Sequence, residues 1–148
     1  MLGTLLGSAL TYIFQRRTVG HVSALAAAER HRQEGLEAYV AFTGAAVRYR
    51  TAALDRWHRY REDPDGEEHR LAHADFHRLR TALIDAQLRM DLVTGDVELR
   101  KLADVVVDAT GQIHDAATDD DRAARTEAAS AALDEFVTRA ATRLREQG

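Results

Sequence analysis

The chain has 148 residues, of which 45% are hydrophobic and 30% charged, and this balance fits one folded domain rather than a disordered segment. It contains no cysteine, which excludes disulfides, thiol catalysis and cysteine-based zinc sites. Its formal net charge of −4 lacks the strongly basic character of proteins that bind nucleic acid, so we expect no nucleic-acid partner.

The first 15 residues, MLGTLLGSALTYIFQ, carry no charged side chain, and Arg16 and Arg17 follow directly. A helix of this length spans roughly 22 Å, which is short of the ~30 Å hydrocarbon core, so bilayer thinning or snorkelling of the two arginines would have to cover the difference. We expect residues 1–17 to form a single-pass anchor in the cell membrane. Because basic flanks stay on the cytoplasmic side, the predicted orientation puts the N-terminus outside and the remaining chain in the cytoplasm.

Small residues at Gly3, Gly7 and Thr11 form a stripe along this segment. In a lipid-buried helix such a stripe allows close contact with a second helix, so it is a candidate dimer contact. Two alternatives remain for the segment. It could be an apolar helix that covers the bundle or mediates oligomerisation, or part of a span whose true start lies further upstream.

A long helix is predicted over residues 18–63, because no proline interrupts them and apolar side chains recur at helical spacing. Residues 18–35 carry few large apolar side chains and are interpreted as a helical stalk, so that residues 36–148 form the bundle domain. The predicted core face of the second part consists of Leu36, Tyr39, Val40, Thr43, Val47, Leu54 and Trp57.

A turn over residues 63–66, with the sequence Asp-Pro-Asp-Gly, separates this helix from the next one. Asp65 and Glu68 have the spacing of a capping box, which predicts how the second helix begins. That helix is expected from about residue 67 to 93, with a core face of Ala72, Phe76, Leu79, Leu83, Ala86, Met90 and Val93.

Two further breaks follow. Gly95 suits the C-terminal cap of the second helix, and Asp96 suits the N-cap of a third helix, which we expect to continue to Ala116. Thr118 and the acidic residues 119–121 favour the start of a fourth helix, since negative charge stabilises a helix N-terminus. Helices joined by such short loops pack as antiparallel neighbours, so the predicted fold is all-α, with an up-down four-helix bundle.

Histidines gather at the end of the bundle where the first and third loops would meet. His69, His73 and His77 are four residues apart, and the topology brings His58 and His114 to the same end. Imidazoles on one helical face can hold a metal, which makes His58, His69, His73 and His114 weak candidate ligands. Because no carboxylate has the spacing of a helical metal motif, we expect no metal site and favour solvated rim residues.

Arginines and aromatic residues are mixed near the end of the first helix: Arg48, Arg50, Arg56, Trp57, Arg59, Tyr60 and Arg61. Such a mixture can hold phosphates or bases. The favoured interpretation is structural, because cations stabilise a helix C-terminus and the acidic residues 119–121 would lie at the same end. Arg50 falls on the predicted core face and needs a carboxylate partner if it is buried; Asp85 is the expected one.

Several of these stretches carry a resemblance to a known family: residues 32–39 (RQEGLEAY), Phe42, residues 55–59 (DRWHR) and residues 62–64 (EDP). They resemble small actinobacterial proteins with one N-terminal membrane segment and a helical cytoplasmic part. Some of these carry a kilB-type label, taken from plasmid transfer and spread in mycelial bacteria. The resemblance implies no established active site.

The function predicted is that of a non-enzymatic, membrane-tethered helical interaction protein, acting in conjugative plasmid transfer or at the cell envelope. We found no glycine-rich phosphate loop and no nucleophile motif, so no catalytic residue and no cofactor is expected. A protein partner or a second copy of the chain would bind a bundle face or the small-residue stripe. The alternative is a cytoplasmic ligand- or metal-sensing bundle that uses the histidines, and the family label adds growth-inhibitory membrane toxicity as a third hypothesis.

Overall fold

The computed structural model describes the backbone of residues 3–147 and the side chains of residues 19–147. It divides into two compact units, Met1–Glu34 and Gly35–Gly148. Across the described residues there are four α-helices, one short 3₁₀ helix and no strand, which confirms the all-α prediction.

The first helix, α1 (Gly3–Glu62), contains the whole predicted helix of residues 18–63 apart from its last position and begins further upstream. Side chains from residue 19 to the end of the first unit are exposed or half-buried, and the exposed ones include Val19, Val22 and Leu25. No helix, over the residues that the structure describes, is long and apolar enough to cross a membrane. The predicted anchor and its stripe lie outside the residues with described side chains: Gly3, Gly7, Thr11, Arg16 and Arg17.

The second helix, α2 (Glu67–Thr94), begins after the expected turn but without the expected capping box. Its N-cap is Gly66, which makes no side-chain hydrogen bond, so the prediction of Asp65 and Glu68 as a box is wrong. Gly66 closes the turn by donating its N–H to the Asp63 carbonyl at 3.1 Å. A Cβ at residue 66 would lie 2.6 Å from the Asp63 carboxylate, so only glycine fits without displacing that side chain.

The connection between α2 and the third helix, α3 (Val97–Gly111), follows the sequence prediction closely. Gly95 adopts a left-handed conformation with φ of 59°, which glycine tolerates without strain. The Asp96 side chain accepts hydrogen bonds from the backbone N–H groups of Glu98 and Leu99 at 3.0 and 3.1 Å. The predicted N-cap is therefore confirmed.

The third helix ends earlier than expected, because α3 stops at Gly111 and a 3₁₀ helix, η1 (Gln112–Asp115), replaces its predicted last turn. Glycine is a poor residue for a helix interior, and 3₁₀ turns are common at helix ends. The last helix, α4 (Asp119–Glu146), begins as expected: the Thr118 hydroxyl accepts a hydrogen bond from the Asp121 N–H at 3.1 Å.

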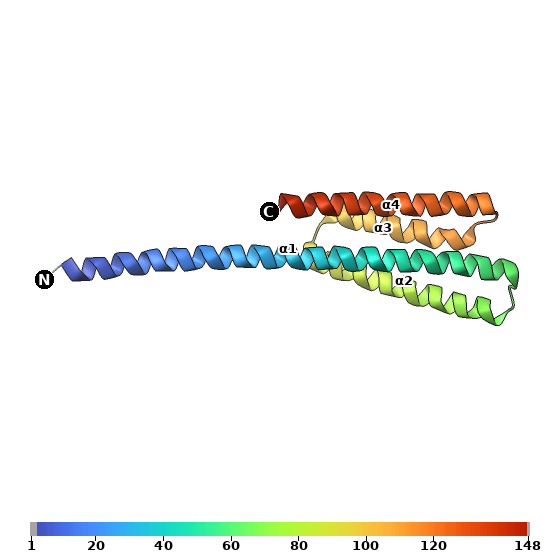
Figure 1. The fold of residues 1–148 in the computed structure, drawn as a ribbon, viewed down its shortest axis with the longest axis horizontal. Coiled ribbons are helices and arrows are strands. Elements are labelled where there is room, and N and C mark those ends of the chain that lie inside the picture. The colour runs from blue at the N-terminus through green and yellow to red at the C-terminus, as the bar shows by residue number, and fades with distance from the viewer. Residues whose placement is uncertain (1–2, 148) are drawn as a thin grey trace. The chain divides into compact units, whose positions relative to one another are not determined.

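Within the second unit the four helices run up and down in antiparallel order (Figure 1). Aromatic pairs join α1 to its neighbours: Phe42 meets Phe136 of α4 with ring centroids 4.6 Å apart, and Tyr49 meets Phe76 of α2 at 4.9 Å. The largest fully buried side chains belong to all four α-helices and to η1: Phe42, Tyr49, Leu83, Met90, Leu99, Val106, Thr110, Ile113 and Phe136.

The predicted core face of α1 is only half right. Tyr39 and Trp57 are buried, whereas Leu36, Val40 and Val47 are exposed. The buried face instead carries aromatic residues together with small ones that let the neighbouring helices approach: Ala38, Phe42, Ala45, Ala46, Tyr49, Ala52 and Ala53. Three of the seven residues predicted for the core face of α1 therefore remain outside the core.

Candidate functional site

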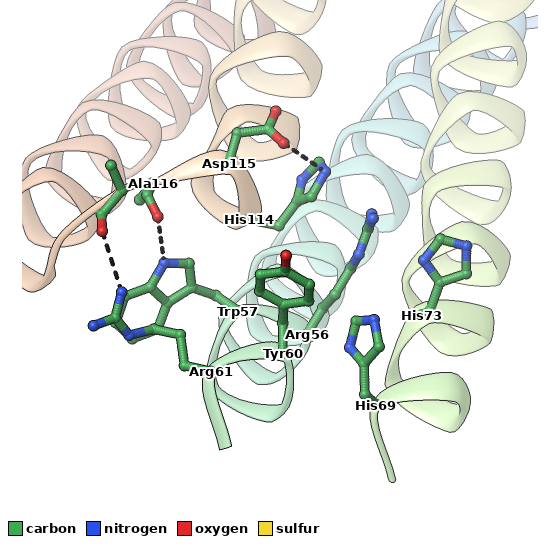
Figure 2. A pocket seen from close by; sticks show the side chains of 10 residues that line it. Arg56, Trp57, Tyr60, Arg61, His69, His73, His114, Asp115 and Ala116 are labelled. Carbon is green, nitrogen blue, oxygen red and sulfur yellow. Dashed lines mark hydrogen bonds and ion pairs between the residues drawn. The ribbon is translucent and has the colours of Figure 1, made fainter. Parts of the chain in front are cut away.

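A cavity of about 460 Å³ lies at the end of the bundle where α1, α2 and η1 meet (Figure 2). We call it the distal cavity. Its lining comes from all three elements and from the start of the η1–α4 loop: Arg56, Trp57, Tyr60, Arg61, His69, His73, His114, Asp115, Ala116 and Ala117. The fold thus brings together residues that lie as much as 61 positions apart in the sequence.

Trp57 forms one wall of this cavity and ties α1 to the η1–α4 loop. Its indole N–H donates to the Ala116 carbonyl at 2.8 Å, and the side chain is only 4% exposed. The guanidinium groups of Arg61 and Arg122 lie 4.8 and 5.1 Å from its ring centroid. These contacts hold the η1–α4 loop, which follows directly after η1, against α1.

Arg56 reaches into the cavity between His114 on one side and His69 and His73 on the other, as Figure 2 shows. Its guanidinium lies 4.7 Å from the centroid of the Phe76 ring. Burial lowers the pKa of Arg56, with a smaller opposing influence from the nearby Asp115 carboxylate. A partly desolvated cation therefore lines the cavity.

Three of the four candidate metal ligands line this cavity, namely His69, His73 and His114. His58 does not; it is exposed and its ring packs edge-on against Trp57 at 5.0 Å. Among the residues that the structure describes, no group of three or more ligand side chains is arranged to hold a metal ion.

The histidines differ in their surroundings. Burial, reinforced by the positive charge of Arg56, lowers the pKa values of both His73 and His114. His114 Nδ1 lies 2.5 Å from the Gly111 carbonyl, and its Nε2 lies 3.1 Å from the Asp115 carboxylate. His69 Nδ1 is buried and has no hydrogen-bond partner among the described residues.

The arginine-rich end of α1 is partly paired, but not with the residues expected. The acidic residues at the start of α4 pair within their own helix, Asp119 with Arg122 and Asp121 with Arg125. Arg50 is half-buried and donates to the Ser130 hydroxyl at 2.8 Å. The prediction of Asp85 as its partner is therefore wrong.

A second concave surface lies at the other end of the bundle domain, between α1 and α4. This groove has a volume of about 420 Å³. Its lining, which we call the α1–α4 groove, is almost wholly apolar: Leu36, Tyr39, Val40, Thr43, Gly44, Val137, Ala140, Ala141 and Leu144. The Thr43 hydroxyl is satisfied within α1, where it donates to the Tyr39 carbonyl at 2.8 Å.

Sequence reasoning missed this groove because it assigned Leu36 and Val40 to the core. The sequence does contain a signal for the groove. The number of large apolar residues in α1 is greater than can face its three neighbouring helices at once. Val40 is 63% exposed and Val137 of α4 is 42% exposed. Single exposed apolar residues are ordinary on protein surfaces, whereas these residues lie together in one apolar groove.

Comparison with known proteins gives one family. The family model described as KilB plasmid transfer protein matches residues 36–144, which include every residue that lines the distal cavity and the α1–α4 groove. No curated protein and no solved structure is significantly similar to the chain. Because the match extends over most of the chain and both of its concave surfaces, the chain belongs to the KilB plasmid transfer protein family.

Proposed function

We propose that this chain is a non-enzymatic interaction protein of plasmid transfer that self-associates through the α1–α4 groove and is tethered to a membrane by residues 1–17. Membership of the KilB family supports the role in plasmid transfer. The exposed apolar groove is the observation that carries the proposal of an interaction function. Its action would be positional: the tether localises the bundle, and the groove joins it to a second copy.

The groove has the composition of a helix-packing surface. Leu36 and Val40 of the groove are exposed four residues apart, and the exposed Val47 follows outside the groove after seven more residues, which is the repeat of a packing seam between helices. Gly44, Ala140 and Ala141 lie among the larger residues, and small side chains let another helix backbone approach closely. Burying these side chains against a partner would remove apolar surface from water.

The occupant that these features favour is the same groove of a second copy. The α1 and α4 helices run in opposite directions along the groove, so a two-fold axis across it would build a four-helix seam. The neighbouring charges have both signs, because Arg139 and Arg143 lie beside Glu146 at the end of α4. A self-complementary interface needs such a mixed rim, since like charges from two copies would repel.

The tether is supported by the sequence of the N-terminal segment, where 15 uncharged residues precede Arg16 and Arg17. Cell fractionation tests it directly. We expect the full chain in the membrane fraction and a variant lacking residues 1–17 in the soluble fraction. Recovery of the full chain in the soluble fraction without detergent would refute the tether. That result would not bear on the self-association, which has its own test.

The groove is tested with Val40→Glu, which puts a charge at its centre. Light scattering of the purified full chain should give a dimer mass for the wild type and a monomer mass for the variant, because a buried unpaired carboxylate is costly. Leu92→Glu is the matched control, because Leu92 is 88% exposed on α2, away from the groove, and should leave the dimer intact.

The same two variants connect the interface to plasmid transfer. Val40→Glu should lower the frequency of plasmid transfer between cells, while Leu92→Glu should leave it unchanged. A wild-type chain that is monomeric at about 100 μM, far above the dissociation constants of specific dimers, would contradict the proposal. So would a Val40→Glu variant that remains a dimer.

A further inference from the structure

The charges at the wall of the distal cavity are unbalanced. Arg56 and Arg61 supply two permanent positive charges, and Asp115 is the only carboxylate in the lining. Asp115 lies 3.1 Å from His114 Nε2, and against the two arginines it leaves one net positive charge on the cavity wall. Among residues 19–147, whose side chains the structure describes, no carboxylate forms an ion pair with Arg56 or Arg61.

Arg59 shows that this imbalance belongs to the cavity and not to the whole end of α1. Its guanidinium lies 3.5 Å from Asp55, 3.1 Å from Glu62 and 2.7 Å from Glu68, so three carboxylates neutralise it. Arg59 does not line the cavity. Arg56 and Arg61 do line it, and the direct contacts of their guanidinium groups are with aromatic rings and a backbone carbonyl.

Arg56 is partly buried and forms no direct ion pair among the described residues, and the nearby Asp115 carboxylate offsets only part of the cost of burying its charge. A bound anion would offset the remainder. Arg56 bears that cost, since burial lowers its pKa while its closest aromatic contact is Phe76. Guanidinium groups bind phosphate oxygens through two parallel hydrogen bonds, and this makes arginine the preferred residue for phosphate recognition. Two guanidinium groups line this one cavity, and together they could form a phosphate-binding site.

Two further aromatic side chains line the cavity, His69 on α2 and Tyr60 on α1. His69 lines the cavity from α2, and its Nδ1 is buried without a hydrogen-bond partner among the described residues. The Tyr60 ring is 56% exposed and lies 5.3 Å from the His69 ring, centroid to centroid. The cavity volume of about 460 Å³ exceeds the size of a bare phosphate ion and falls in the range of small-ligand pockets.

We propose that the distal cavity binds a small phosphate-bearing anion, with Arg56 and Arg61 holding the phosphate. The ligand chemistry is that of inorganic phosphate, pyrophosphate or an organic phosphomonoester. The phosphate lies among the arginines, and Tyr60 provides a face for an organic group. This site is separate from the α1–α4 groove and does not depend on self-association.

The single tryptophan of the chain makes the test direct, because Trp57 lines the cavity. The full chain is titrated in turn with inorganic phosphate, pyrophosphate and adenosine monophosphate. Sodium chloride at matched ionic strength is the blank. Calorimetry and tryptophan emission should both show saturable binding by at least one of the three, with a dissociation constant below about 1 mM. A preference for adenosine monophosphate over both inorganic ions would assign the organic source, and the reverse preference would assign the inorganic one.

Substitutions then distinguish binding at this site from attraction to the overall positive charge at the end of α1. Arg56→Gln and Arg61→Gln should each weaken binding by about tenfold or more, because each removes a charge-assisted contact. Arg59→Gln removes the same charge from the same turn and should leave binding within about twofold. Arg56→Lys keeps the charge next to Phe76 but loses the planar fork, so it should also bind more weakly and serves if Arg56→Gln fails to fold.

Two results would overturn the proposal. One is the absence of saturable binding by all three probes at millimolar concentration. The other is equal weakening by Arg59→Gln and Arg56→Gln, which would show attraction to the overall charge of the helix end. Melting curves and circular dichroism of each variant confirm that it is folded before binding is measured.

Discussion

Replacing Trp57 by phenylalanine tests how the end of the bundle is held together. The indole N–H is the only side-chain donor of this residue, and it bonds the Ala116 carbonyl at 2.8 Å in a buried position. Phenylalanine keeps an aromatic ring but cannot donate. The substitution therefore removes the bond between α1 and the η1–α4 loop while keeping much of the packing.

The expected cost can be added up from the contacts. Losing the hydrogen bond costs about 1 kcal/mol, and leaving the Ala116 carbonyl without its partner adds up to about 1–2 kcal/mol. The smaller ring leaves a small cavity worth about 1 kcal/mol. Weaker attraction to the guanidinium groups of Arg61 and Arg122 adds a few tenths of a kcal/mol. The total is about 2–4 kcal/mol, which lowers the melting temperature by roughly 8–16 °C for a domain of this size.

Urea unfolding followed by the helical circular dichroism signal measures this cost, since the variant has no tryptophan to report fluorescence. Leu92→Ala is the control, because Leu92 is 88% exposed and its truncation should change the free energy of unfolding by less than about 0.5 kcal/mol. If Trp57→Phe costs no more than this control, the indole bond does not hold the loop, and the geometry of the distal cavity must have another cause.

Two further predictions concern stability. Asp96→Ala removes the α3 N-cap and the partner of Arg143, whose Nε lies 3.3 Å from the Asp96 carboxylate, so urea unfolding should show a loss of about 1–2 kcal/mol. The exposed Asp75→Ala, which breaks only a surface pair, should cost less than about 0.5 kcal/mol by the same measurement. The pKa values of His73 and His114 are lowered by burial and by Arg56, so the unfolded chain binds more protons than the folded chain just below the ordinary histidine pKa of about 6.5. Stability should therefore be intact above about pH 6.5 and fall as the pH is lowered through the folded-state pKa values, and thermal melts between pH 5 and 8 should show this fall flattened in His114→Asn. A melting temperature that is constant or rises on acidification would contradict it.

Local interactions account for what the sequence predicted well. The bonds of the Asp96 cap join residues two and three positions apart, and Gly95 needs only its own backbone freedom. Such signals are complete within a short window of sequence. The same holds for Thr118, whose hydroxyl reaches the N–H of Asp121.

Long-range packing explains what the sequence could not predict. Which face of α1 is buried depends on which side meets α2 and α4. The face with alanines beside Phe42 and Tyr49 is buried instead of the face with Leu36 and Val40, because alanines allow the helices to approach more closely. Periodicity alone gives equal weight to both faces.

The candidate site was also predicted in part, with the local features predicted and the long-range contacts missed. Sequence spacing placed His69 and His73 on one helix face, and topology brought His114 to the same end. The roles of the arginines could not be predicted, because they depend on three-dimensional pairing. Arg59 is neutralised by three carboxylates, while Arg56, one helical turn earlier, turns toward Phe76 and the cavity.

The contact between Phe42 and Phe136 has a consequence for how the chain folds. It joins the first long helix to the last one, so the core around Phe42 closes only after α4 has been synthesised. The connections between successive helices are short, and helical hairpins with such local contacts form on the microsecond-to-millisecond scale. During synthesis Tyr49 of α1 can therefore meet Phe76 of α2 early, whereas Phe42 stays uncovered by its partner until the last helix leaves the ribosome.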